Sequence, residues 1–330
     1  MSVRDTTILK GIAILFMLYL HLFNQIGNVD LCVTHLSVGN TPLVYLFTRC
    51  TNPVAFFLLL SGYGLYASYK LGKRDSMRRI GKLYVHYWLT LLIFVPLGWW
   101  IHGSEVYPGS WKQILENVSG WYTGYNGEIW FLFPYMLLVL TSVQLFRWMD
   151  KVKLIPFFLL AGSLYFFTYV LVYFWGDSYL YTHQGGYILV LYFNLLFPFL
   201  LGGIMMKYNI INKCKIKKEV ALALIVLLML MRMCIATSFF HVFFAAIFII
   251  LFMSLGRGKW LDCFLYEMGR RSTSMWFVHT YFCYYLFHDF IYNFKNPLLI
   301  FTVLLVCSYI SALVIDYLNN KIQKLINFKS

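Results

Sequence analysis

The first apolar run of the chain carries two side chains that could do chemistry inside a membrane. Residues 8–26 are predominantly apolar, yet they contain Lys10 and His21. Eleven residues of α-helix make three turns plus roughly 20°, so the two side chains are expected on one face, about 16 Å apart along the axis. Ionisable groups that face lipid cost several kcal/mol, so such a pair is expected to face the protein interior or a water-filled cavity.

Each of these residues also has a simpler interpretation. Lys10 would extend its ammonium group to the membrane surface, and His21 would be a buried, hydrogen-bonded histidine. As a pair, however, they combine an anion-binding group with the side chain best suited to take a proton near neutral pH. Asn24 and Gln25 follow His21 by three and four residues, a spacing that places them on its helical face. They would orient the imidazole or a substrate.

The composition indicates an integral membrane protein. The 330 residues are 61% hydrophobic and only 12% charged, whereas a soluble domain has about 25% charged residues. The net charge of +14 would suggest nucleic acid binding in a soluble protein, but here it reflects basic loops that favour anionic membrane lipids, so no nucleic acid partner is expected. The seven cysteines show no CxxC or Cys/His spacing, and we predict no metal site.

The elements that must position these residues are membrane-spanning helices. We predict an all-α polytopic protein with about ten spans and a single membrane domain over residues 1–330, without internal repeats. The two shorter runs near residues 220–255 are interpreted as two spans or one re-entrant hairpin. The expected spans are approximately residues 8–26, 42–69, 80–101, 128–147, 154–175, 185–206, 220–236, 239–255, 272–292 and 297–318.

The distribution of basic residues predicts the orientation. With ten spans, all Lys and Arg residues fall on one side of the membrane except Arg49, Lys112, Lys295 and Arg232. The positive-inside rule then places both termini in the cytoplasm. Lys10 would lie near the cytoplasmic face and His21 in the outer half of the membrane.

Short motifs in the other runs complete the pattern. They are Phe56-Phe57 followed by Ser61-Gly62-Tyr63, the basic segment from Arg78-Arg79 to Tyr84, Glu128-Ile129-Trp130, and the segment from Ser274 to His279. In order and spacing, this set resembles membrane acyltransferase family 3, whose members O-acylate bacterial surface glycans. The resemblance covers most of the chain. The sequence departs from the family pattern at Lys10, where Arg is more usual, and at Ser76, where the first of two paired arginines would stand.

The resemblance implies an O-acetyltransferase of the bacterial plasma membrane. Its acyl donor would be cytoplasmic acetyl-CoA, and its acceptor a cell-surface glycan or a lipid-linked sugar precursor. Removing a hydroxyl proton requires a base, and His21 is expected to be that base or a transient acyl carrier. Lys10, Arg78 and Arg79 are expected to hold the CoA phosphates through charge-assisted hydrogen bonds.

The remaining candidates have two interpretations each. Ser61 is assigned to the donor path but is also typical of close helix packing. His279 would contact CoA or make a hydrogen bond between helices. Glu128 would favour a helix dipole or orient His21. Trp130 would stack on a sugar together with neighbouring aromatic residues, or belong to an interfacial aromatic belt.

Two other function classes fit a polytopic chain. A secondary transporter or flippase of a lipid-linked sugar would commonly show related halves with interrupted helices, which the sequence lacks. A structural membrane subunit would not need a polar face on its first helix. Either type of protein, like the acyltransferase, could form a homo-oligomer.

Overall fold

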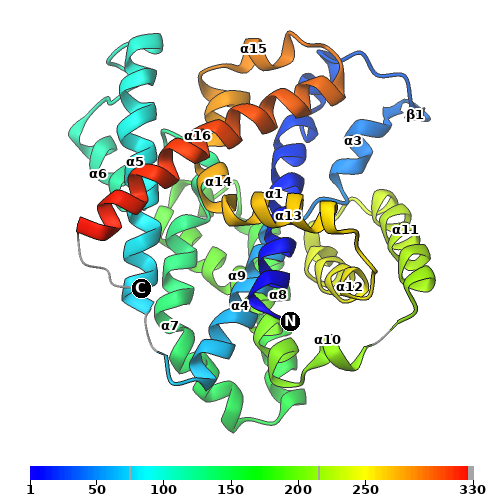
Figure 1. The fold of residues 1–330 in the computed structure, drawn as a ribbon. Coiled ribbons are helices and arrows are strands. Elements are labelled where there is room, and N and C mark those ends of the chain that lie inside the picture. The colour runs from blue at the N-terminus through cyan, green and yellow to red at the C-terminus, as the bar shows by residue number, and fades with distance from the viewer. Residues whose placement is uncertain (74–75, 215, 326–330) are drawn as a thin grey trace.

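The computed structural model describes residues 1–73, 76–214 and 216–325, and these residues form an almost entirely helical molecule (Figure 1). A small antiparallel pair, β1 (Ser37–Val38) and β2 (Thr41–Pro42), lies in the loop after the first two helices. The longer helices are α1 (Val3–Phe23), α4 (Pro53–Lys70), α5 (Ser76–His102), α7 (Leu132–Lys151), α8 (Leu154–Trp175), α9 (Gln184–Lys207), α11 (Lys218–Cys234) and α16 (Pro297–Leu325). The shorter ones are α2 (Ile26–Asp30), α3 (Leu43–Thr48), α6 (Trp111–Ser119), α10 (Ile210–Lys213), α12 (His241–Met253), α13 (Lys259–Arg270), α14 (Ser272–Thr280) and α15 (His288–Tyr292).

Seven helical segments in the described part of the chain are long and apolar enough to cross a membrane. They are Val3–Phe23, Leu43–Lys70, Ser76–His102, Gly127–Lys151, Leu154–Trp175, Gln184–Lys207 and Pro297–Leu325. Their apolar outer faces include Leu92, Tyr173 and Leu298, which are more than two-thirds exposed in the isolated chain. Such surfaces are expected to face lipid, because a soluble protein of this kind would cover them. The all-α, multi-pass prediction is therefore confirmed.

The other three predicted spans are shorter or interrupted. Residues 220–255 form two separate helices, α11 and α12, that pack against each other across a short turn. Residues 272–292 begin as α14, pass through a π-helical turn at Tyr281–Tyr285 and end as α15. The total of about ten spans and the cytoplasmic position of the termini stay predictions.

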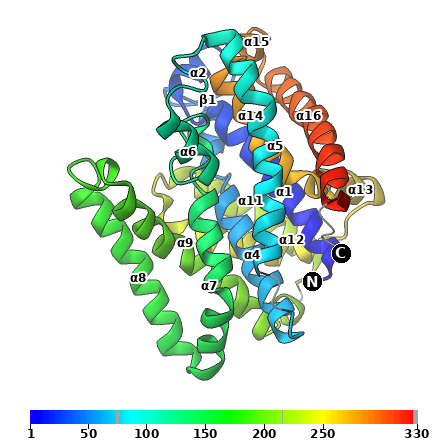
Figure 2. The same ribbon diagram turned by 90° about the vertical axis from the view of Figure 1, so that its left-hand side faces the viewer.

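Helix α1 crosses the centre of the molecule and packs on α4, α13, α14 and α16 (Figures 1 and 2). Glycines allow its contact with α13, because a Cβ atom at Gly11 would lie 2.0 Å from the carbonyl oxygen of Leu265. A Cβ atom at Gly269 would lie 1.8 Å from the carbonyl oxygen of Thr7. Small residues let membrane helices approach closely, and here they fix α13 beside the turn of α1 that carries Lys10.

Glycines also allow the close contact between α4 and α9. A Cβ atom on Gly62 would lie 1.8 Å from the carbonyl oxygen of Phe199, and one on Gly202 would lie 2.0 Å from that of Leu59. Gly62 belongs to the Ser61-Gly62-Tyr63 motif, so part of that motif has a packing role.

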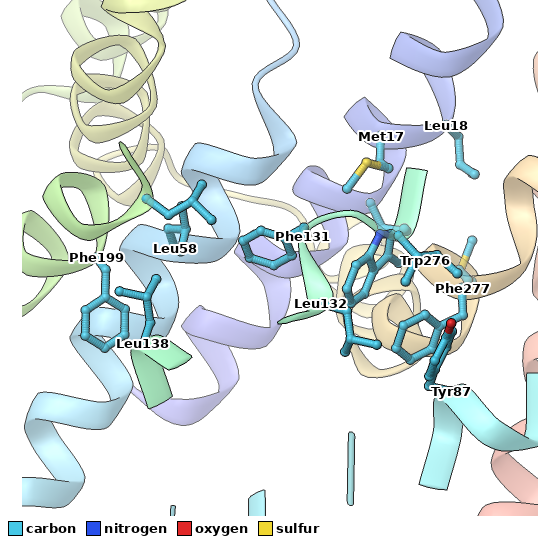
Figure 3. Close-up of a cluster of buried hydrophobic side chains, with 14 of the residues drawn as sticks. Met17, Leu18, Leu58, Tyr87, Phe131, Leu132, Leu138, Phe199, Trp276 and Phe277 are labelled. Carbon is cyan, nitrogen blue, oxygen red and sulfur yellow. The ribbon is translucent and has the colours of Figure 1, made fainter. Parts of the chain in front are cut away.

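The main hydrophobic core lies between α1, α4, α5, α7, α9 and α14 (Figure 3). Leu18, Leu132 and Phe277 are completely buried within it. These side chains lie on α1, α7 and α14, and His21 and His279 are carried by α1 and α14.

Candidate active site

Lys10 and His21 line one cavity of about 480 Å³. Both project from α1, as their helical spacing predicts, although they lie three turns apart. The other polar residues of the cavity wall come mainly from α4, α7, α11 and the loops that precede them. They are Asn24, Thr48, Arg49, Thr51, Asn52, Ser61, Glu128, Tyr135, Arg232, His241, Ser272 and Thr273.

His21 lies between a second histidine and a carboxylate. Its Nδ1 atom is 2.6 Å from Nε2 of His279, and its Nε2 atom is 3.3 Å from Oε2 of Glu128. The two imidazole rings are nearly parallel, 20° apart. His21 is 7% exposed and His279 is completely buried, so water does not compete for the bond between them.

The backbone of α14 determines where the protons of this pair reside. Nδ1 of His279 lies 2.8 Å from the carbonyl oxygen of Trp276 and 3.2 Å from that of Met275. A carbonyl only accepts hydrogen bonds, so Nδ1 of His279 carries a proton and its Nε2 accepts one from Nδ1 of His21. The remaining nitrogen of His21, Nε2, is then the one that can take up a proton.

Ion pairs hold α14 at its first turn. Asp316 of α16 accepts hydrogen bonds from Arg271, at 2.7 Å, and from Ser274, and it lies 3.5 Å from Nε2 of His86 on α5. Arg271 also donates to Glu267 of α13 at 2.7 Å. This network connects three helices around α14 and anchors the first turn of the helix that carries His279.

At the Lys10 end, the cavity carries hydroxyl groups. Oγ of Ser61 lies 3.0 Å from the hydroxyl of Tyr135, and both side chains line the cavity. A smaller cavity of about 220 Å³ is lined by Arg79 and Lys82 and shares Tyr135, Leu83 and Thr273 with the larger one. The two cavities are therefore neighbours and extend from the basic first turns of α5 toward Lys10.

A comparison with known protein families matches the acyltransferase domain over residues 5–317. The chain belongs to acyltransferase family 3. No curated protein and no solved structure matches the chain. As a family member with several apolar helices, the acyltransferase is a multi-pass membrane enzyme.

The acyltransferase brings most of the predicted site residues to the cavity. Lys10, His21, Asn24, Ser61, Glu128 and Trp130 all line it. Arg79 lines the adjoining cavity, and its guanidinium donates to Ser68 Oγ at 2.9 Å. Glu128, for which two roles were open, contacts His21. Asn24 accepts a hydrogen bond of 3.0 Å from the hydroxyl of Tyr284.

Three predicted residues lie elsewhere. Helix α1 ends at Phe23 and Gln25 is extended (φ −109°, ψ 126°), so Gln25 leaves the face of His21 and does not line the cavity. His279 is completely buried behind His21, a position that supports the interhelical hydrogen bond and not a contact with CoA. Arg78 lines neither cavity, although one of its guanidinium nitrogens is buried without a partner among the described residues.

Sequence reasoning missed several residues of the cavity wall. Arg232 is a basic residue in the middle of an apolar run, and it donates to the carbonyl oxygens of Ile235 and Thr237. Nothing in the sequence marked Arg49 or Tyr135 as residues of the cavity wall. Among the residues that the structure describes, no group of His, Cys, Asp or Glu is arranged to hold a metal ion.

Proposed function

We propose that this acyltransferase moves an acetyl group from acetyl-CoA to a hydroxyl of a cell-surface glycan or its lipid-linked precursor, in the plasma membrane of a bacterium. The observation that carries the proposal is the arrangement at His21. One imidazole nitrogen is engaged by His279, and the other faces Glu128 inside a cavity that also contains Lys10. An aligned base in a partly dry cavity is what acyl transfer to a poor nucleophile requires.

In the proposed reaction, Nε2 of His21 takes the proton of the acceptor hydroxyl while the hydroxyl oxygen attacks the thioester carbonyl carbon. The imidazolium is stabilised by its hydrogen bond to His279 and by the negative charge of Glu128. When the carbon–sulfur bond breaks, the same proton passes from His21 to the departing thiolate. The products are the acetyl ester and CoA, and His21 is returned to its neutral form.

The cations are assigned to the donor. Lys10 in the larger cavity and Arg79 in the adjoining one lie along one path, which suits a polyanionic nucleotide with a long, narrow arm. Charge-assisted hydrogen bonds to phosphate are stronger than neutral ones. With both termini in the cytoplasm, this path would open toward the compartment that holds acetyl-CoA.

Replacing His21 by Ala tests the proposal. Loss of a general base lowers a rate by about 10²–10⁴-fold, so acetyl transfer from labelled acetyl-CoA to membrane glycan should fall by that factor. Binding of CoA to the purified variant should stay within about twofold, because the cations remain. The matched variant Lys10→Ala should instead weaken CoA binding.

Mass spectrometry of surface glycan from cells with and without the active protein identifies the acceptor and the acyl group. Wild-type acetylation by the His21→Ala variant would remove His21 from the mechanism. Movement of a lipid-linked sugar across vesicles without acyl transfer would favour a flippase and contradict the proposal.

A further inference from the structure

The cavity has a second positively charged region, separate from Lys10 and Arg79. Arg49 and Arg232 both line the cavity, and two contacts join the segments that carry them. Nη1 of Arg49 donates to the carbonyl oxygen of Met233 at 2.8 Å, and Sγ of Cys50 donates to that of Met229 at 3.2 Å. The two guanidinium groups therefore belong to one corner of the cavity.

No negative charge balances this corner in the described part of the chain. Neither Arg49 nor Arg232 forms a salt bridge there. The one acidic residue on the cavity wall is Glu128, which is paired with His21. Arg232 is only 3% exposed, and its Nε atom has no hydrogen-bond partner among the described residues. Burial of a cation without a counter-charge is costly, so the site is suited to an anion.

Helix α4 starts at the same corner. Thr51, Asn52, Pro53, Val54 and Ala55 line the cavity, and Asn52, at the N-cap position, makes no side-chain capping hydrogen bond. No acceptor for the amides of Val54 and Ala55 is found in the described residues. An uncapped helix N-terminus attracts anions through its free amides and its dipole. It adds to the two arginines here.

Contacts between α1 and α4 place this corner near His21. The two helices are antiparallel, because the N-terminal amine of Met1 contacts the hydroxyl of Tyr63 at 2.9 Å while the rings of Phe16 and Phe56 lie 5.7 Å apart. The start of α4 is therefore level with the C-terminal turns of α1, where His21 lies. Lys10 and Ser61 lie further toward the other end of the cavity.

We propose that Arg49, Arg232 and the N-terminus of α4 bind a carboxylate or phosphate group carried by the acceptor, so that the enzyme selects an acidic glycan or a phosphate-linked precursor. The inference rests on the proposed function, since it places the acceptor hydroxyl at His21. The donor cations lie at the Lys10 end, which leaves this second cationic corner for the other substrate. Anchoring the acid group would orient one hydroxyl toward Nε2 of His21.

A binding experiment tests the site without any acyl transfer. Thermal unfolding of the full chain in detergent is followed with D-glucuronate, inorganic phosphate and neutral D-glucose as probes. The two anions should stabilise the wild-type protein and glucose should not. Arg232→Gln and Arg49→Gln should each weaken binding of the anions by about tenfold or more, because each removes a charge-assisted hydrogen bond.

Two control variants show whether the binding of the anions depends on this site. Arg232→Lys retains the charge and should retain part of the binding, even if the carbonyl contacts of Arg232 are lost. Arg147→Gln removes an exposed arginine of α7 and should bind the anions like the wild type. Equal stabilisation of the wild type and both Gln variants, or no stabilisation of the wild type by either anion, would overturn the site.

A kinetic experiment decides which substrate the site holds. Membranes containing the protein are supplied with labelled acetyl-CoA, and the labelled glycan is separated by anion exchange. The inference predicts that the label appears in the anionic fraction. It also predicts that Arg49→Gln raises the KM for the acceptor about tenfold and leaves the KM for acetyl-CoA unchanged. A raised KM for acetyl-CoA would assign the arginines to the donor and overturn it, as would label confined to neutral glycan. If the wild type transfers no acetyl group, the proposed function is wrong. The thermal unfolding experiment still decides whether the site binds anions.

Discussion

The nitrogens of His21 and His279 have unequal access to the cavity, and this inequality assigns their roles. His279 uses both nitrogens inside the protein, one toward backbone carbonyls and one toward His21. Nε2 of His21 lies 3.3 Å from Oε2 of Glu128 in the cavity wall, and it is the nitrogen proposed to meet the substrate. The imidazole of His279 is therefore a positioning group, which fixes the tautomer and the ring orientation of the proposed base.

Replacing His279 by Ala should slow turnover without affecting the donor. Loss of a hydrogen bond to a charged imidazolium is worth about 1.5–3 kcal/mol, so we expect kcat to fall about 10- to 100-fold with an unchanged KM for acetyl-CoA.

The variant His279→Gln provides the control. Its amide oxygen can accept from Nδ1 of His21, so part of the rate should return. A His279→Ala variant that loses thermal stability but retains the wild-type kcat would reduce His279 to a packing residue.

Sequence reasoning at the residue scale succeeded where helix geometry alone decides the outcome. Lys10 and His21 share a face because the helix between them is regular. Gln25 does not, because α1 ends two residues before it. The contact between His21 and His279 spans 258 positions of the chain, and no local pattern predicts such a pair.

At the scale of elements, glycine contacts decide how closely the helices approach. Hydropathy predicted the helix over residues 154–175 at the bounds that the structure shows, since a long apolar run with Lys153 before it and Gly176-Asp177 after it leaves no alternative. It did not predict which helices touch. The contact between α4 and α9 depends on Gly62, whereas Gly64, two residues later, has open space around the position of a Cβ atom.

These two glycines form a matched pair for mutation. Gly62→Ala would place a Cβ atom 1.8 Å from a backbone oxygen of α9, so the helices must separate, and we expect destabilisation of about 1–3 kcal/mol. Gly64→Ala should be neutral or stabilising by up to about 1 kcal/mol, because alanine favours the helix.

Thermal unfolding in one detergent measures both variants. Equal stability of the two would show that α4 and α9 are not in close contact at Gly62. Since Ser61 precedes Gly62, loss of this contact should also lower acetyl transfer.

At the scale of the whole molecule, the described apolar helices surround the cavity that contains Lys10 and His21. The core holds α1 between α4, α13, α14 and α16, so residues from both ends of the sequence reach the same cavity. Composition and charge predicted the membrane class and an orientation. They could not predict the cavity, because its wall combines residues from Lys10 to Trp276.

Labelling of single cysteines tests the predicted orientation. In a background in which the other cysteines are replaced by Ser, Cys214 is exposed and follows α10, in a loop expected in the cytoplasm. A Cys at position 37 (Ser37→Cys) lies in the exposed segment expected outside.

The cells are stripped of the layers outside the plasma membrane, which itself stays intact. A membrane-impermeant maleimide should then label Ser37→Cys and should reach Cys214 only after the plasma membrane is opened. The reverse pattern would place the termini outside, and the donor path from Arg79 would then open away from cytoplasmic CoA.

The π-helical turn after α14 has one further consequence. It begins at Tyr281, two residues after His279, and accommodates one extra residue. The turn contains Tyr284, whose hydroxyl donates a hydrogen bond to Asn24. A regular helix would turn every following side chain by about 100°. The two ends of this segment are thus set independently. The upstream part keeps the contact between His279 and His21, and a change within this one turn would redirect Tyr284 and its contact with Asn24 without moving that pair.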